Sequence, residues 1–422
     1  MITHVTKLAN GVQVVSCPMP HVESVAVGIW AAVGGRHESP RLHGMSHFME
    51  HMVFKGTARR SARRIMQEIE GIGGDINAST TEERTCYYAS APMEYLTQVV
   101  DVLTDLYCHA RFAPADIELE RGVINEEIQM YLDEPAQHVQ ELLHEKFWPN
   151  QALGRPLTGT PESIARFRKK DFVDYLAANY QGRATIVTAA GNLDHARLVE
   201  QVEKTLGGLQ SGSRPRDVRA RVRRSGPKLH VVTKETQQTN VAMGLPMPGY
   251  RDPERFAANV LHVLLGGNAS SRLFQELREK RGYCYSISTY PVTFADTGML
   301  NLSIGLDAKN LERAFQVIGR QFSRIREQRC SPIELRRAKE YLIGLSRMSM
   351  ERTSSQSSRL GQSLLAHGRV LDPAEIYAKI RAVTPEDIQA VARKILRPEG
   401  VCAVVIGPVK RSETWLEALA SN

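Results

Sequence analysis

The 422-residue chain has no run of about 18 apolar residues, which is the length that a membrane-spanning helix needs. The first residues, MITHVTKLANGVQVVSC, alternate between apolar and polar, and we expect them to form a β-strand and not a signal or transit peptide. We therefore expect a cytoplasmic protein without a membrane segment. Export by a route with no recognised signal is the alternative.

Paired cysteines are also missing. The six cysteines are scattered and form no CxxC pair: Cys17, Cys86, Cys108, Cys284, Cys330 and Cys402. In a chain with 42% hydrophobic and 24% charged residues, this pattern indicates neither a disulfide framework nor a thiolate zinc site. We expect most of these cysteines to be small buried apolar residues in a globular protein of two to four domains.

A broad basic surface is not indicated, although the formal net charge is +8. One segment, SGSRPRDVRARVRRSGPK at 211–228, holds six arginines, one lysine and one aspartate, a net charge of +6. The remaining residues therefore carry only +2, which argues against a nucleic-acid-binding protein. The segment is aperiodic and rich in Ser, Gly, Pro and Arg, and it is typical of a solvated linker.

This linker separates two similar parts of the sequence. DIELERGVINEEIQM (116–130) resembles PIELRRAKEYLIGLS (332–346), and residues 169–193 align with 385–409, both at an offset of 216. VAVGIWAAVGGRHES, from residue 25, also matches VAMGLPMPGYRDPE, from residue 241. A nearly constant offset over three segments indicates duplication of one α+β unit. We therefore expect two halves, 1–210 and 229–422, joined by a hinge at 211–228.

Local patterns predict the elements of the first half. Apolar and turn residues predict strands, a hairpin and three helices, of which the last begins at Pro114 and runs to about Tyr131. The predicted strands are 11–16 and 24–33, the hairpin is 74–91, and the first two helices are 41–55 and 61–71.

The segment HGMSHFMEHMVFKGT (43–57) contains the most specific pattern. On a helix, His47 and His51 stand at i and i+4 on one face, and Glu50 lies nearly on the same face. Two imidazoles at this spacing can bind one zinc ion, with Glu50 close enough to act on an attacking water. A surface or core coincidence is the alternative, since His pairs at this spacing are common.

The third ligand that such a site requires is expected on the acidic helix that begins near Pro114. Glu120 and Glu127 lie two turns apart on one face, whereas Glu118 and Glu126 point elsewhere. One of the pair can bind the metal, and the other can orient a ligand histidine.

The second half serves as an internal comparison, because His47 aligns there with His262. The other site positions do not retain their character: Glu50 aligns with Leu265, His51 with Gly266, Glu120 with Arg336 and Glu127 with Ile343. Polar residues needed only for the fold would recur in both halves. Their presence in one half favours a chemical role.

At these motifs the chain resembles the pitrilysin/insulinase superfamily of zinc metallopeptidases. HFMEHMVFKGT, GGDINASTTEERTCYYA and ERGVINEEIQMYLDEP carry the resemblance, which extends over essentially the whole chain. The inverted motif HxxEH is the inverzincin signature, and the 76-residue step from His51 to Glu127 matches the family spacing. Within the superfamily, the sequence most resembles bacterial processing-peptidase-like proteins and the β-subunit of the mitochondrial processing peptidase.

The resemblance implies roles for individual residues. His47, His51 and Glu127 would hold one Zn²⁺ per chain, Glu50 would be the general base, and Glu120 would be the supporting carboxylate. Asn77 and Ala78 match the edge-strand segment that holds the substrate backbone in such enzymes.

A further pair is implied in the second half. Arg278 and Tyr285 match an Arg/Tyr pair that reaches the zinc site in active relatives, where the Tyr stabilises the oxyanion. The match is imperfect around Gly282, which makes Tyr283 a possible substitute for Tyr285. Packing at a helix end is the structural alternative for this pair.

The resemblance also implies a fold and an activity. The expected fold is α+β, with two homologous halves that each contain a mixed, mainly antiparallel sheet packed with helices and that together enclose a chamber. The expected activity is zinc-dependent endopeptidase cleavage of unfolded peptides bound as an extended strand. The expected partners are peptide substrates and a second chain, either in a homodimer or in a heterodimer with a homologous subunit, and neither nucleic acid nor a membrane. A non-catalytic scaffold subunit is the competing function.

Overall fold

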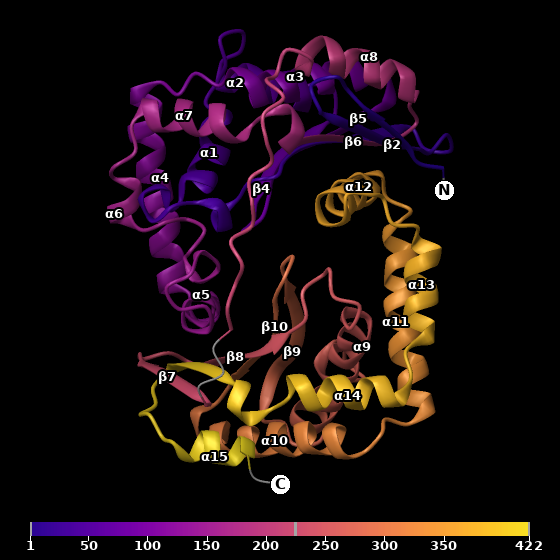
Figure 1. Ribbon diagram of the computed structural model, residues 1–422. Helices are drawn as coiled ribbons and strands as arrows, with labels where there is room; N and C mark the ends of the chain where they lie inside the picture. The colour runs from indigo at the N-terminus through magenta and orange to yellow at the C-terminus, as the bar shows by residue number, and fades with distance from the viewer. Residues whose placement is uncertain (1, 223–225, 421–422) are drawn as a thin grey trace. The chain divides into compact units, whose positions relative to one another are not determined.

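The chain is described here from a computed structural model that covers residues 2–222 and 226–420. It divides into two compact units, each with one mixed β-sheet packed with helices (Figure 1), which confirms the predicted α+β class. Unit 1 comprises Met1–Ile128, Arg155–Val218 and Arg347–Leu371, and unit 2 comprises Gln129–Gly154, Arg219–Ser346 and Asp372–Asn422.

The sheet of unit 1 has the strand order β1-β2-β6-β3-β5-β4. The pair β2 and β6 is parallel, and every other neighbouring pair is antiparallel. The strands are β1 (His4–Lys7), β2 (Gln13–Pro18), β3 (Ser24–Ala31), β4 (Asp75–Thr80), β5 (Thr85–Pro92) and β6 (Thr185–Gly191). The helices grouped with this sheet are α1 (Met45–Val53), α2 (Ala62–Glu70), α3 (Leu96–His109), most of α4 (Pro114–Asp133), α6 (Pro161–Ile164), α7 (Lys169–Asn179), α8 (His195–Leu206) and α12 (Thr353–His367).

The sheet of unit 2 has the order β7-β11-β8-β10-β9. The pair β7 and β11 is parallel, and the others are antiparallel. The strands are β7 (Lys228–Thr233), β8 (Thr239–Met247), β9 (Cys284–Thr293), β10 (Gly298–Leu306) and β11 (Cys402–Gly407). The helices are α5 (Pro135–Phe147), α9 (Arg255–Gly266), α10 (Leu311–Glu327), most of α11 (Pro332–Ser349), α13 (Pro373–Ala382), α14 (Pro385–Ile395) and α15 (Thr414–Ala420), together with a short π-helix at Phe274–Glu279.

The two sheets confirm the duplication that the sequence predicts. Strands β2, β6, β3, β5 and β4 of unit 1 correspond in order and direction to β7, β11, β8, β10 and β9 of unit 2. Helix α4 corresponds to α11, as the 216-residue offset predicts. Asp171 and Asp387 also match, because each carboxylate accepts a hydrogen bond from the backbone N–H at the start of its helix.

Each unit includes one helix from the opposite side of the linker. Strands β6 and β11 are buried along their whole length, so each sheet needs a covering layer on both faces. In unit 1 this layer is α12, which packs on β3 and β6 opposite α3 (Figure 1). In unit 2 it is α5, which packs on β8 and β11. The predicted division into 1–210 and 229–422 therefore differs from the two units, because α5 precedes the linker but belongs to unit 2 and α12 follows the linker but belongs to unit 1.

Residues 223–225 of the predicted linker lie outside the described part of the chain, and the rest of the linker is mostly exposed but is held at several points. Arg36 donates hydrogen bonds to the carbonyl oxygen of Val218, and Asp217 lies 3.1 Å from the ring of His37. Two residues later, Ala220 donates to the carboxylate of Asp296 in unit 2. Within the linker, the chain therefore passes from unit 1 to unit 2 after Val218.

The predicted local elements of the first half are close to those observed. The strand expected at 24–33 is β3, the hairpin is formed by β4 and β5, and the long helix begins at Pro114 as predicted. The helix expected at 41–55 begins later, at Met45, because Pro40–Leu42 forms a separate 3₁₀ turn and Gly44 has a φ of +91°.

The structure agrees with two expectations from the composition, that the cysteines form no disulfide framework and that no helix spans a membrane. All six cysteines are free, and five of them are buried. Within residues 2–222 and 226–420, we find no helix that is both long and apolar enough to cross a bilayer.

Candidate metal centre

Helix α1 presents its two histidines and Glu50 on one side. Met45, Phe48, Met49 and Met52 recur at helical spacing and are fully buried in the core of unit 1. This apolar face fixes the rotation of the helix, so that the remaining face carries His47, Glu50 and His51.

Helix α4 provides the acidic side of the site. Ile117, Ile124 and Ile128 are buried and hold the helix against the same core. Glu120 shares this buried face and is 4% exposed, and Glu127 is partly buried two turns further on. The predicted common face of the two carboxylates is therefore observed.

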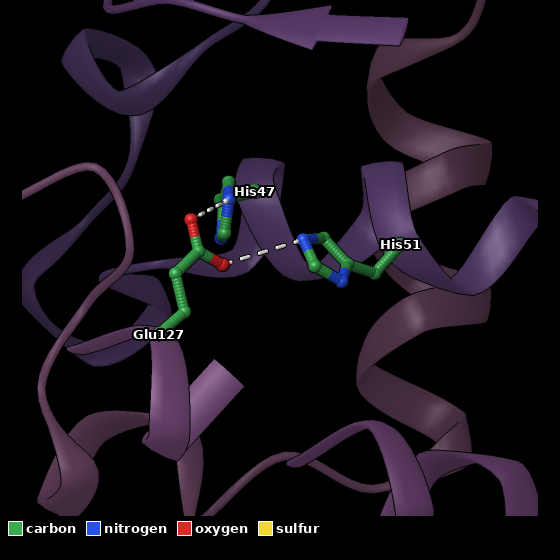
Figure 2. A group of neighbouring side chains, drawn as sticks. All are labelled: His47, His51 and Glu127. Atoms are coloured by element: carbon green, nitrogen blue, oxygen red, sulfur yellow. Dashed lines mark ion pairs between the residues drawn. The ribbon is translucent and has the colours of Figure 1, made fainter. Parts of the chain in front are cut away.

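Three side chains converge between these helices (Figure 2). The two oxygens of Glu127 lie 3.6 Å from Nε2 of His47 and 3.6 Å from Nε2 of His51. One donor atom from each of the three residues falls within 4.8 Å of the others. In the described part of the chain, this is the one group of three or more such residues that could hold a metal ion.

These separations fit a zinc ion. Ligand atoms about 2.0–2.1 Å from a tetrahedral zinc lie roughly 3.3–3.4 Å from one another. Each observed 3.6 Å separation, to a different oxygen of Glu127, is close to this value and is too long for a good hydrogen bond. The three residues would leave a fourth position open, as in catalytic rather than structural zinc sites.

The protonation of His47 suits a metal ligand. Burial and the neighbouring His51 lower the pKa of His47 to about 4, although Glu127 opposes this shift. The ring is therefore neutral at pH 7 and has a lone pair for a metal. Its buried Nδ1 has no hydrogen-bond partner among the described residues.

Glu120 and Lys55 stand behind His51. Nδ1 of His51 lies 2.9 Å from Oε1 of Glu120, and the ammonium of Lys55 forms an ion pair with the other oxygen of Glu120. Burial raises the pKa of Glu120, but the hydrogen bonds from His51 and Lys55 outweigh it and hold this pKa below its ordinary value. An ionised Glu120 accepts the Nδ1 proton of His51 and so leaves Nε2 directed at Glu127.

Lys55 was not singled out in the sequence. The signal for it was present, since Lys55 follows His51 by four residues in HFMEHMVFKGT. Nothing in that spacing identifies its partner, however, because Glu120 is 65 residues away in the chain.

Glu50 lies next to the three metal-binding residues but does not belong to their cluster. Burial raises its pKa above the ordinary value, and hydrogen bonding to Thr80 and the nearby His51 oppose the rise. A carboxylate with increased proton affinity beside a metal site is suited to accept a proton from water. Thr80, at the end of β4, is a second contact that the sequence did not reveal.

Asn77 and Ala78 lie on β4, which is the edge strand of its sheet. Their partners on β5 are Tyr88 and Tyr87, and no further strand is hydrogen-bonded to β4 among the described residues. The backbone N–H of Ala78 donates to the side-chain oxygen of Asn77 instead of to another strand. Such an edge can accept an additional strand.

Arg278 and Tyr285 belong to unit 2. Arg278 lies in the π-helix, and its guanidinium is 4.8 Å from the ring centre of Phe274 and 5.4 Å from that of Tyr285. Tyr285 is 78% exposed, at the start of β9. Gly282, with a φ of +61°, forms the turn between them. The structure thus brings Arg278 and Tyr285 together as a stacked pair.

The corresponding positions of unit 2 do not form a metal site. His262 lies on α9, and its pKa is lowered to about 4 by burial. A side chain at Gly266 would collide with Thr289, and both Leu265 and Ile343 are fully buried. Leu265, Gly266 and Ile343 have become part of the core, which agrees with the comparison of the two halves.

The fold and the site together define a class: an α+β protein of two homologous units, with a His/His/Glu cluster of the HxxEH type in the first that could hold a metal ion. Residues 13–161 match the family described as insulinase (peptidase family M16), and residues 166–342 match the peptidase M16 inactive domain. The chain belongs to peptidase family M16.

The similar proteins have matching lengths. An uncharacterized zinc protease of Streptomyces coelicolor is 36% identical over 96% of this chain and 89% of its own length, and one of Bacillus subtilis is 34% identical over 94% and 96%. Among solved structures, a protease from Helicobacter pylori aligns with a TM-score of 0.89 at 20% identity, covering 96% of this chain and all of that one. A peptidase M16 inactive domain from Pseudomonas fluorescens aligns with a TM-score of 0.88 at 16% identity over 98% of this chain and all of its own.

Proposed function

We propose that the protein is a zinc-dependent endopeptidase that hydrolyses unfolded peptides. The observation that carries this proposal is the convergence of His47, His51 and Glu127 beside Glu50. Membership of a peptidase family and the names of the zinc protease relatives support the same reaction and metal.

The proposed roles of the metal ligands follow from their geometry. His47, His51 and Glu127 hold the zinc, and Glu120 keeps His51 oriented through its Nδ1 proton. A bound zinc supplies a Lewis acid that polarises the scissile carbonyl and makes water acidic near neutral pH.

Glu50 moves the proton in this proposal. Its carboxylate accepts a proton from water as the water oxygen forms a bond to the scissile carbonyl carbon. The same proton then passes from Glu50 to the amide nitrogen as the carbon–nitrogen bond breaks. The products are one carboxylic acid, which gives its remaining proton to solvent, and one amine, and Glu50 returns to its ionised form.

The substrate is proposed to bind as an extra strand on β4. The open edge at Asn77 and Ala78 supports this mode, because backbone hydrogen bonds along an edge depend little on sequence. Most extended segments of a folded protein are already paired within its own sheets, so unfolded peptides are the expected substrates.

The second half is proposed to complete the site. Arg278 and Tyr285 would reach the bound peptide when the two halves close around a chamber, with Tyr285 donating a hydrogen bond to the oxyanion. We further propose that a second, homologous chain takes part in the assembly, in a homodimer or a heterodimer. Light scattering of the purified protein, alone and after co-expression with a homologous subunit, distinguishes these assemblies.

Peptide cleavage tests the function directly. Wild type and Glu50→Gln are incubated with a mixture of unstructured peptides of 10–30 residues, and the products are read by mass spectrometry together with the zinc content. We expect cuts by wild type that disappear in Glu50→Gln while zinc is retained. Glu126→Gln, an exposed neighbour of a ligand, is the matched control and should cut like wild type.

Other results would contradict the proposal. Equal cleavage by wild type and Glu50→Gln would remove Glu50 as the base. Zinc binding without cleavage, in every assembly tested, would favour the scaffold function.

A further inference from the structure

A buried carboxylate lies at the start of the helix that carries the metal ligands. Oε2 of Glu38 accepts a hydrogen bond of 2.8 Å from the backbone N–H of Gly44, and Oε1 accepts one of 2.6 Å from that of Ser46. Glu38 is only 5% exposed. Since the first N–H groups of a helix have no partner within the helix, this side chain satisfies two of the donors at the start of α1.

Helix α1 has no residue of its own that could do this. The residue at its N-cap is Gly44, which has no side chain and a φ of +91°. A Cβ at this position would lie 2.7 Å from the Cα of Gly159, so a capping Ser, Thr, Asp or Asn does not fit. The cap must therefore come from elsewhere in the chain, and Glu38 supplies it.

Glu38 is itself held firmly. Its carbonyl oxygen accepts a hydrogen bond of 2.6 Å from Arg155, and the N–H of the nearby Arg36 donates to the carbonyl oxygen of Glu82. Arg36 is 1% exposed and forms an ion pair with Glu83. The carboxylate thus projects from a fixed turn rather than from a mobile loop.

The capped residues lie beside the first metal ligand. Ser46 directly precedes His47, and its hydroxyl is also hydrogen-bonded to the hydroxyl of Tyr175 at 2.7 Å. His47 sits in the first helical turn, where the backbone loosens most readily without a cap. A metal site tolerates displacements of only about 0.5 Å in its ligands.

We propose that Glu38 is a positioning residue of the metal centre: its carboxylate holds the first turn of α1 so that His47 meets His51 and Glu127. The inference rests on the metal site of the proposed function but not on peptide hydrolysis. An ordinary stabilising cap is the competing interpretation, and it predicts a loss of stability with no specific effect on metal binding.

Zinc affinity distinguishes the two. Glu38→Gln keeps the volume but turns an amide N–H₂ towards a backbone N–H. The control is Ser61→Ala, which removes the cap of the neighbouring helix α2, where the Ser61 hydroxyl accepts from the N–H of Arg64. The zinc dissociation constant is measured by competition with a chromophoric chelator, and the melting temperature of the metal-free protein is measured in parallel.

We expect Glu38→Gln to raise the zinc dissociation constant about tenfold, which is the effect of losing a cap worth about 1.4 kcal/mol. Ser61→Ala should lower the melting temperature and leave the dissociation constant within about twofold of wild type. If Glu38→Gln does not fold, Glu38→Asp keeps the charge on a shorter side chain, and we expect a smaller rise in the same direction.

The proposal is overturned if Glu38→Gln, or Glu38→Asp in its place, melts earlier but binds zinc like wild type. It is also overturned if Ser61→Ala weakens zinc binding as much, because the effect would then follow general stability. A wild type that binds no zinc would refute the metal site as well. A wild type that binds zinc without cutting peptides would refute only the hydrolysis.

Discussion

At the scale of single residues, the candidate metal centre includes a pair of opposite charges, Glu120 and Lys55, that lies beside the three proposed ligands. Glu120 is nearly buried and contacts both His51 and Lys55. A buried carboxylate with one cationic partner removed takes a proton more readily. The orientation of the His51 ring therefore depends on Lys55, which contacts Glu120 but none of the three proposed metal ligands.

Replacing Lys55 should weaken metal binding. In Lys55→Met, Glu120 loses its ion pair, and its hold on the Nδ1 proton of His51 becomes weaker. We expect the zinc dissociation constant to rise about 10–100-fold, as is usual when a partner of a ligand histidine is disturbed. Competition with a chelator measures this. Lys170→Met, which breaks an exposed ion pair with Asp174, is the control and should bind zinc like wild type.

Single substitutions can also show whether Tyr285 or Tyr283 is the oxyanion donor. If Tyr285 donates to the oxyanion, Tyr285→Phe should lower kcat about 10²–10³-fold with little change in KM, because the bond is made mainly in the transition state. Tyr283→Phe should then be close to wild type. The opposite ranking would assign the role to Tyr283, and two unimpaired variants would leave the oxyanion without a tyrosine donor.

At the scale of elements, the duplicated units differ in what they place on equivalent helices. Helix α1 carries three polar site residues, whereas α9 retains His262 alone. Helices α5 and α12 are equivalent as well, since each covers the second face of a sheet. The packing of α12 on unit 1 is close at Gly361, which lies against the indole of Trp30.

This contact predicts opposite effects for one substitution at two glycines. A Cβ at Gly361 would lie 2.2 Å from an indole carbon of Trp30, so Gly361→Ala should destabilise the protein by about 1–3 kcal/mol. Gly344 on α11 has nothing within 4 Å of the added atom, so Gly344→Ala should be neutral or stabilise by up to about 1 kcal/mol. Urea unfolding measures both, and equal effects would mean that α12 does not pack on Trp30.

At the scale of the whole molecule, two partly buried histidines predict loss of stability in acid. Burial lowers the pKa of His144 and of His262 to about 4, both in unit 2, whereas an unfolded histidine has a pKa of about 6.5. Below pH 6.5 the unfolded chain therefore binds protons that the native chain does not. The stability contributed by the neutral rings is complete above pH 6.5 and declines as the pH falls towards 4.

Each of these histidines should contribute a slope of up to about 1.4 kcal/mol per pH unit in this range. We expect His144→Gln and His262→Gln to reduce the slope of unfolding free energy against pH between 6.5 and 4. His21→Gln changes an exposed ring and serves as the control. Parallel curves for wild type and the double variant would contradict the assignment.

Much of the fold was predictable because the sequence contains it twice. The repeat at an offset of 216 identifies equivalent helices and strands from the sequence alone. The exchange of α5 and α12 was not predictable. Each is an amphipathic helix, and periodicity shows that a helix needs an apolar partner but not which sheet provides it.

By itself, the sequence determined the chemical identity of the site: two histidines at i and i+4, a glutamate beside them, and two glutamates on one face of a second helix. These spacings are local, and helical geometry converts them directly into faces. Only the tertiary structure decided that Lys55 meets Glu120, that Thr80 contacts Glu50 and that Glu38 caps α1. Those contacts arise where separate elements pack together, and no local spacing specifies them.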